Sequence, residues 1–119
     1  MIIYYTKEGK FEVNAISQIP YSKLHREDGP AYISPNDVNR YFKNGKLHRT
    51  DGPAIEWCPT KYKKQIINNT LITQEHYIFN DWWLNGKKLN RKEVINWLNT
   101  YNIDLKNKKN QMLFMLKFG

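Results

Sequence analysis

The stretch that decides the fold occurs twice, as Lys23-Leu24-His25-Arg26-Glu27-Asp28-Gly29-Pro30-Ala31 and as Lys46-Leu47-His48-Arg49-Thr50-Asp51-Gly52-Pro53-Ala54. These nonapeptides, called the first block and the second block below, differ at one position of nine and lie 23 residues apart. A period of this length is typical of proteins in which one small supersecondary unit is stacked on copies of itself. We therefore expect repeated structural units in this part of the chain.

Each block ends in Asp-Gly-Pro, which is turn chemistry. Asp accepts local backbone hydrogen bonds, Gly can adopt a positive φ, and Pro fixes φ ahead of a strand. Asn44-Gly45, just before the second block, is the strongest short signal for a hairpin, because both central residues of a type I′ turn need a positive φ. We expect strands over residues 2–6, 11–15, 31–33, 38–43, 46–48 and 54–57.

A third, incomplete copy begins at Trp82. Residues 82–87 read Trp-Trp-Leu-Asn-Gly-Lys and align with residues 41–46, which read Tyr-Phe-Lys-Asn-Gly-Lys. Tyr4-Tyr5 ahead of Gly9-Lys10 is a fainter copy, with one additional residue. Beyond residue 89 the block is replaced by a helical pattern, which fits the atypical terminal units that cap repeat arrays.

The C-terminal part is expected to hold two helices. Asn90 and Glu93 have the spacing of a capping box, and the apolar residues that follow keep a helical spacing up to Tyr101. A second helix is expected over 109–117, with Met112, Met115 and Leu116 facing inward. The predicted fold is an α+β domain, a meander of short antiparallel repeat hairpins capped by two helices. A single domain spans 1–119, with hairpins over 1–89, an irregular insertion at 58–76 and the helical cap over 90–119.

Composition limits the class of protein. The chain has 119 residues with 40% hydrophobic and 14% aromatic content, which favours a folded domain. No apolar run approaches the roughly 18 residues of a membrane span, and the first residues do not resemble a secretion signal. We therefore expect a cytoplasmic protein. Its single cysteine, Cys58, excludes an internal disulfide and a cluster of thiolate ligands.

The charge is unevenly distributed along the chain. Residues 1–60 carry eight Lys/Arg and seven Asp/Glu, whereas residues 61–119 carry eleven Lys/Arg and four Asp/Glu. This asymmetry indicates either an anionic partner for the second half or a composition that serves solubility. The candidate anion-binding side chains lie in this half: Lys61, Lys63, Lys64, Lys87, Lys88, Arg91 and Lys92. Arg91 and Lys92 are placed in the first turn of a helix, where the macrodipole disfavours cations. A bound anion would compensate this unfavourable positive charge.

The sequence of the blocks resembles a group of short proteins from bacteriophages and large DNA viruses. The resemblance rests on residues 23–31, 41–54 and 82–87, and the helical C-terminal tail is similar as well. These proteins carry tandem units of the form Tyr-x-x-Asn-Gly-Lys-x-His-Arg-x-Asp-Gly-Pro-Ala, loosely similar to MORN β-hairpin repeats. The resemblance implies a β-hairpin repeat protein of phage origin, acting in the host cytoplasm. MORN repeats bind lipids and proteins, but they centre on Gly and Tyr and lack His-Arg-x-Asp.

The blocks themselves allow two interpretations. His25 with Asp28, and His48 with Asp51, have residue types that ligate metals. Alternatively each block is a structural corner, in which the Asp caps its own turn and the Arg binds a carboxylate or carbonyl. We favour the structural corner, formed by His25, Arg26, Asp28, His48, Arg49 and Asp51, and expect neither metal nor cofactor.

Aromatic pairs alternate along the predicted strands, so one member of each pair should face each side of the sheet. Tyr41, Trp82 and Trp83 are candidate contacts for bases or for a protein partner, unless the helices and the insertion cover both faces. No phosphate-binding loop, nucleophile elbow or zinc-protease motif is present, and no catalytic set stands out.

The expected function is that of a non-enzymatic phage accessory protein that binds an anionic host component. A counter-defence inhibitor is the favoured role, acting on a nucleic-acid-handling immune complex in the manner of an anti-CRISPR protein, or sequestering a nucleotide signal. The alternatives are a MORN-like protein-binding or lipid-surface module and a small metal-dependent nuclease.

Overall fold

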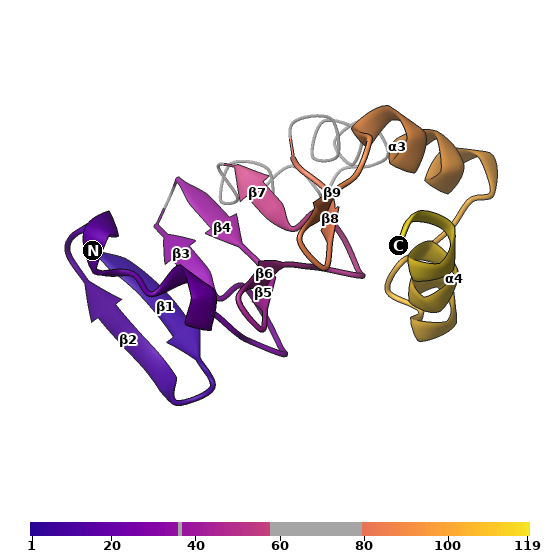
Figure 1. The fold of residues 1–119 in the computed structure, drawn as a ribbon. Helices are drawn as coiled ribbons and strands as arrows, with labels where there is room; N and C mark the ends of the chain where they lie inside the picture. Colours follow the sequence, from indigo (N-terminus) through magenta and orange to yellow (C-terminus); the bar gives the residue numbers. More distant parts are fainter. Residues whose placement is uncertain (36, 58–79) are drawn as a thin grey trace.

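A five-stranded antiparallel sheet at one end and two helices at the other form an elongated molecule of 42 × 30 × 21 Å (Figure 1). The fold was established from a computed structural model that describes residues 1–35, 37–57 and 80–119. The predicted insertion at 58–76 lies outside the described residues. The prediction of an α+β domain with two C-terminal helices is confirmed.

The sheet has the strand order β2-β1-β3-β4-β7. Its outer hairpin joins β1 (Ile2–Thr6) and β2 (Gly9–Val13), with Tyr4 opposite Phe11 and their rings stacked at 5.1 Å. Single-turn 3₁₀ helices η1 (Ile16–Gln18) and η2 (Tyr21–Lys23) then lead into the first block. The remaining strands are β3 (Tyr32–Ser34), β4 (Val38–Arg40) and β7 (Ile55–Trp57).

The prediction of one continuous strand over 38–43 is wrong. The chain divides at Tyr41 into β4 and β5 (Phe42–Lys43), which belong to different sheets. At this corner the backbone N–H of Tyr41 donates to the carbonyl of Ala54 at 2.7 Å, and the carbonyl of Tyr41 accepts from the N–H of His48 at 3.0 Å. Both backbone groups of Tyr41 are therefore satisfied by the second block and its exit rather than by a continuing ladder.

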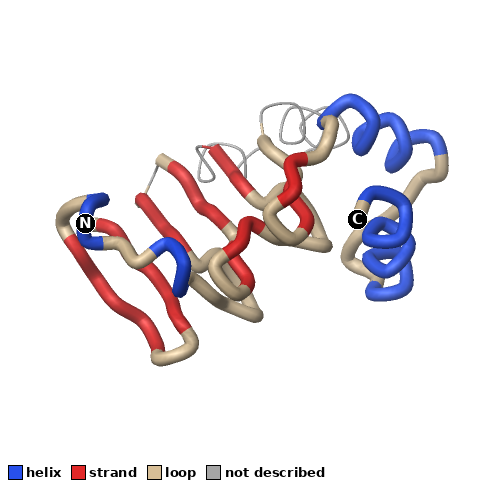
Figure 2. The backbone as a smooth tube through the Cα atoms, viewed as in Figure 1, coloured by secondary structure: helices blue, strands red, loops and turns tan. Residues whose placement is uncertain are grey.

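Two tight hairpins project beside the sheet (Figure 2). One pairs β5 with β6 (Lys46–Leu47), and the other pairs β8 (Trp83–Leu84) with β9 (Lys87–Lys88). Asn44 and Gly45 have φ of 52° and 77°, and the turn of the second hairpin has φ of 49° and 79°. The predicted Asn-Gly turns with positive φ are confirmed at both positions.

Helix α3 (Arg91–Thr100) begins as the capping box predicts. The Asn90 side chain accepts a hydrogen bond from the backbone N–H of Glu93 at 3.1 Å. Val94 and Leu98 are buried, whereas Tyr101 lies beyond the last helical residue and is 67% exposed. The helical spacing places Tyr101 on the apolar face of this helix, but the helix ends at Thr100 and the side chain of Tyr101 is exposed.

Helix α4 (Lys108–Phe118) packs through a different residue from those predicted. Phe114 is fully buried, whereas Met112, Met115 and Leu116 are 60%, 38% and 81% exposed. The predicted inward face is therefore wrong. Five consecutive apolar residues, 112–116, surround the helix axis, so helical spacing alone does not identify the side that packs.

The core has two parts. The first cluster lies against the sheet, beside the first block, and includes Leu24, Tyr32 and Val38. A second cluster joins the last hairpin to the helices, and its members are Trp82, Leu84, Leu89, Val94, Leu98, Leu105 and Phe114. The hairpin β8–β9 thus connects the sheet to the helical end of the molecule.

Candidate functional site

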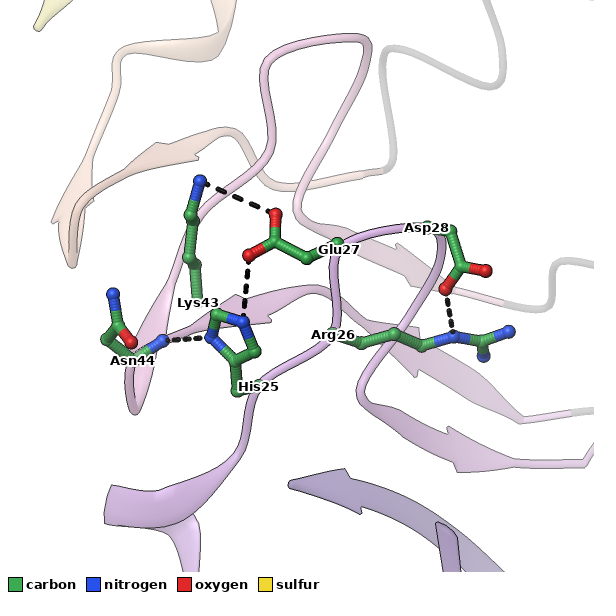
Figure 3. Close-up of polar contacts among 6 residues, drawn as sticks. All are labelled: His25, Arg26, Glu27, Asp28, Lys43 and Asn44. Carbon is green, nitrogen blue, oxygen red and sulfur yellow. Dashed lines mark hydrogen bonds and ion pairs between the residues drawn. The ribbon is translucent and has the colours of Figure 1, made fainter. Parts of the chain in front are cut away.

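The first block folds around the guanidinium of Arg26 (Figure 3). Its Nε donates to the Oδ1 atom of Asp28 at 3.0 Å, and its Nη1 donates to the carbonyl of Pro30 at 3.1 Å. The guanidinium carbon lies 3.9 Å from the ring centroid of Tyr5, a cation–π contact. A Cβ at Gly29 would lie 2.9 Å from the same carbon, so only glycine lets the guanidinium pack this closely.

The second block has the same arrangement around Arg49. The Arg49 Nε donates to Asp51 at 2.7 Å, Nη1 donates to the Pro53 carbonyl at 3.1 Å, and the guanidinium lies 4.0 Å over Tyr41. A Cβ at Gly52 would lie 3.0 Å from the guanidinium carbon. In both blocks, Arg, Asp, Gly and Pro thus serve one compact turn closed by an aromatic ring.

The two histidines connect each block to the next Asn-Gly turn. His25 Nδ1 accepts from the backbone N–H of Asn44, and His48 Nδ1 accepts from that of Asn85, each at 3.0 Å. A backbone N–H can only donate, so each Nδ1 carries no proton and each ring has its proton on Nε2 when neutral. Burial, with a contribution from the Lys43 charge, lowers the pKa of His48 and favours this neutral form.

These contacts bear on the metal interpretation of the blocks. With Nδ1 engaged, each ring offers at most Nε2 as a ligand, and His25 Nε2 already bonds the Oε1 atom of Glu27 at 2.9 Å. Across residues 1–35, 37–57 and 80–119, no three His, Cys, Asp or Glu side chains gather where they could hold a metal ion. The geometry supports the structural corner.

The one difference between the blocks gives them different neighbours. In the first block, the Glu27 carboxylate contacts both His25 and the ammonium of Lys43, the latter at 3.6 Å (Figure 3). In the second block, the Thr50 hydroxyl donates to the Gln111 side-chain oxygen on α4 at 2.8 Å. The substitution of Thr for Glu therefore coincides with the docking of the C-terminal helix.

Arg49 also belongs to a buried charge cluster. Its Nη1 lies 3.3 Å from the Oε2 atom of Glu56, whose side chain is only 3% exposed. Burial alone would lower the pKa of Arg49, but the Glu56 carboxylate and the other neighbouring groups raise it. The pKa of Tyr41 is raised, mainly by burial and further by Glu56. These side chains hold the corner together, and the sequence did not single out Glu56.

A pocket of about 430 Å³ lies between the two blocks. Its lining includes three basic side chains and three carboxylates, each in an ion pair with a described group: Arg26, Lys43, Arg49, Glu27, Asp28 and Asp51. Because these charges compensate one another, the pocket has little attraction for an anion.

The candidate anion-binding residues do not form one site in the described part of the chain. Arg91 Nη2 and Lys88 Nζ lie 3.0 and 4.0 Å from the Oδ1 atom of Asp81. Lys87 Nζ donates to the Phe118 carbonyl at 3.3 Å, at the C-terminus of α4 where a cation is favoured. Lys92 is exposed. The remaining three candidates, Lys61, Lys63 and Lys64, lie outside the described residues.

Asp81 is the residue that sequence reasoning missed here. Its carboxylate supplies the counter-charge that the sequence does not reveal for Arg91 in the first turn of α3. Asp81 and Arg91 are ten residues apart in the sequence, and the hairpin β8–β9 between them brings their side chains into contact. A bound anion is therefore not needed to explain Arg91.

The candidate aromatic residues do not form an exposed row. Tyr41 lies under Arg49, and Trp82 is 1% exposed with its ring edge against Phe114 at 5.6 Å. Trp83 is half-buried against the sheet cluster. Tyr41 is covered by the second block, Trp83 by the sheet cluster and Trp82 by α4. The covering expected from the insertion lies outside the described residues.

The exposed apolar surface lies instead at the helical end. A groove of about 610 Å³ separates α3 from α4, lined by Trp97, Tyr101, Ile103, Asn110, Leu113, Leu116 and Lys117. Sequence reasoning missed this groove because it placed Tyr101 on the apolar face of its helix and expected Leu116 to face inward. The available signal was the apolar run 112–116, which is too wide for one packed face.

No known protein family, curated protein or solved structure matches this chain. None of the described helices has the length and apolar character required to cross a membrane.

Proposed function

We propose that this chain is a non-enzymatic binding protein whose basic C-terminal end attaches to an anionic host component. The observation that carries the proposal is the charge of residues 80–119, which hold eight Lys/Arg and three Asp/Glu. One of these three carboxylates, Asp81, is shared by Lys88 and Arg91. Most of the positive charge therefore remains to face solvent.

The uncompensated charge belongs to exposed lysines around the two helices. None of them forms an ion pair within the part of the chain that the structure describes: Lys92, Lys106, Lys108, Lys109 and Lys117. Exposed charges of one sign attract an oppositely charged partner over long distances and set its orientation. The balanced charge of the blocks offers no comparable attraction.

The biological role in this proposal is counter-defence during phage infection. It is supported by the resemblance of the blocks to those of short phage proteins, and the anionic component is then part of a nucleic-acid-handling or nucleotide-signalling defence. The repeat nature of the hairpins belongs to the same proposal. It is supported by one backbone contact of 2.9–3.0 Å found three times, in which the N–H groups of His25, His48 and Leu89 donate to the carbonyls of Tyr5, Tyr41 and Trp82.

The test is affinity capture from host lysate with a charge variant and a matched control. The variant K108Q/K109Q/K117Q removes three lysines from the helical end, and K7Q/K10Q/K23Q removes three equally exposed lysines from the opposite end. We expect the wild-type protein and the control to retain a host component at low salt, and the helical-end variant to lose it. Retention should fall steeply with added salt.

Nuclease treatment of the lysate separates a nucleoprotein from a protein partner. Equal retention by both variants, or retention insensitive to salt, would contradict the proposed function.

A further inference from the structure

Half of the exposed large hydrophobic residues belong to the helical end, where Tyr101, Leu113 and Leu116 line one groove and Met115 lines the pocket between the blocks. Ten large hydrophobic residues are exposed in the described ranges, and five of them fall between residues 101 and 116: Tyr101, Met112, Leu113, Met115 and Leu116. Leu116 is 81% exposed and Tyr101 67%. A concentration of exposed apolar residues on a small domain marks an interaction surface.

Part of this surface is concave. The groove between α3 and α4 has Trp97, Tyr101 and Ile103 on one side and Leu113 and Leu116 on the other. Its volume of about 610 Å³ leaves room for several side chains of a partner.

The side of the groove that holds Trp97 is firmly packed from behind. The Trp97 ring stacks on Phe114 at 6.3 Å and meets Phe118 edge-on at 5.5 Å. Phe114 in turn is fully buried against Trp82. A groove built on packed aromatic rings keeps its shape without a ligand, and this preorganisation reduces the entropic cost of binding.

The charge around the groove selects the kind of partner. Lys117 lines the groove, and Lys109 lies one helical turn before Leu113 on the same side of α4. Residues 103–119, which begin at the groove-lining Ile103, contain four lysines and one carboxylate, Asp104. Another carboxylate, Glu93, borders a smaller neighbouring hollow together with Lys117. A second copy of this chain would bring lysines against lysines, so self-association is disfavoured.

We propose that the groove between α3 and α4 binds an amphipathic α-helix of a partner protein, with apolar residues facing the groove and Asp or Glu beside them. Apolar side chains at positions i, i+3 or i+4, and i+7 insert between Tyr101 and Leu116, as in other helix-in-groove complexes. The carboxylates face Lys109 and Lys117. The inference deepens the proposed function and rests on it, since it identifies the anionic component as an acidic helix.

The test is a selection from a displayed library of random peptides about four helical turns long, on immobilised full-length protein. Peptides are selected on the wild-type protein and removed on the variant L113Q/L116Q. The control is I16Q, which changes a 60% exposed apolar residue at the opposite end of the molecule. Circular dichroism tests whether each variant is folded. If L113Q/L116Q is unfolded, L116Q alone is used in its place.

We expect enriched peptides to be acidic and to carry apolar residues at helical spacing. Their affinity should fall about tenfold or more for L113Q/L116Q and change little for I16Q. Enriched peptides that are basic or lack helical periodicity, or that bind L113Q/L116Q as well as the wild type, would overturn the proposal. So would a lack of enrichment combined with binding to vesicles of phosphatidylserine and phosphatidylcholine, which would identify an anionic membrane as the occupant.

This outcome is distinguishable from failure of the proposed function. If K108Q/K109Q/K117Q loses the captured host component and L113Q/L116Q retains it, a basic binding surface exists but the groove is not part of it. If neither variant loses the component, both proposals fail.

Discussion

Removal of the two block arginines provides a matched test of how the corners are stabilised. Arg26 and Arg49 make the same contacts to an Asp carboxylate, a Pro carbonyl and a Tyr ring. Arg49 differs in one respect, since it also pairs with the buried carboxylate of Glu56. The corresponding residue after the first block is Ile33, which is apolar. The variants R26A and R49A therefore differ mainly by one buried ion pair.

The contacts of each arginine indicate how far R26A and R49A should lower the free energy of unfolding. Asp28 is 86% exposed, and an ion pair of this kind contributes at most about 1 kcal/mol. The cation–π contact with Tyr5 adds roughly 0.5–1 kcal/mol. The hydrogen bond to the Pro30 carbonyl adds about 1 kcal/mol. We therefore expect R26A to lower the free energy of unfolding by about 1–3 kcal/mol. Removing one partner of a buried pair costs roughly 3–5 kcal/mol, so R49A should be more destabilising by about 2 kcal/mol or more.

Urea unfolding followed by tryptophan fluorescence measures both values. A double-mutant cycle with E56Q then isolates the buried pair, because R49A should cost less in the E56Q background, whereas R26A should cost the same in both. Equal destabilisation by R26A and R49A, or no coupling between R49A and E56Q, would show that the buried ion pair does not stabilise the second block.

Three further predictions concern single residues. Burial lowers the pKa of His48 from its ordinary value of 6.5, so the unfolded chain binds a proton on this side chain more readily than the folded protein does. The free energy of unfolding should therefore fall as the pH decreases below 6.5, and its dependence on pH should be weaker in H48Q. G45A should be much more destabilising than G86A in urea unfolding, since both pay about 1–2 kcal/mol for a positive φ, but only the Cβ at residue 45 would collide with the Ser22 carbonyl. T50V should lower stability by about 1 kcal/mol through loss of the hydroxyl's bond to α4, with hydrogen exchange increasing first in that helix.

Local chemistry explains what could be predicted from the sequence. The positive φ of Asn44-Gly45 and the cap at Asn90 each depend on residues within a few positions of one another. Such signals are readable because the backbone requirement and the residue that meets it are adjacent in the chain. The two helices and the α+β class followed from the same kind of signal. The chemistry expected for Asp-Gly-Pro differs in the structure, because neither block glycine has a positive φ and each Asp carboxylate binds the block arginine instead of a backbone N–H.

The features that escaped prediction depend on how distant segments approach each other. The contact of Asp81 with Arg91 and the burial of Glu56 arise only once the hairpins are in place. The division of the strand at Tyr41 requires the backbone of the second block and its exit as partner. The packing of α4 through Phe114 could not be read from a run of five apolar residues, since every face of that helix has a candidate.

We propose that the blocks are structural and that a partner binds at the helical end of the molecule. The most direct test measures the affinity of one captured host component for two folded variants, H48Q and L113Q/L116Q, beside the wild-type protein. We expect H48Q to bind like the wild type at a pH near neutrality, and L113Q/L116Q to bind about tenfold more weakly or not at all. Loss of binding in H48Q with unchanged stability, together with normal binding by L113Q/L116Q, would contradict this proposal and place the function in the blocks.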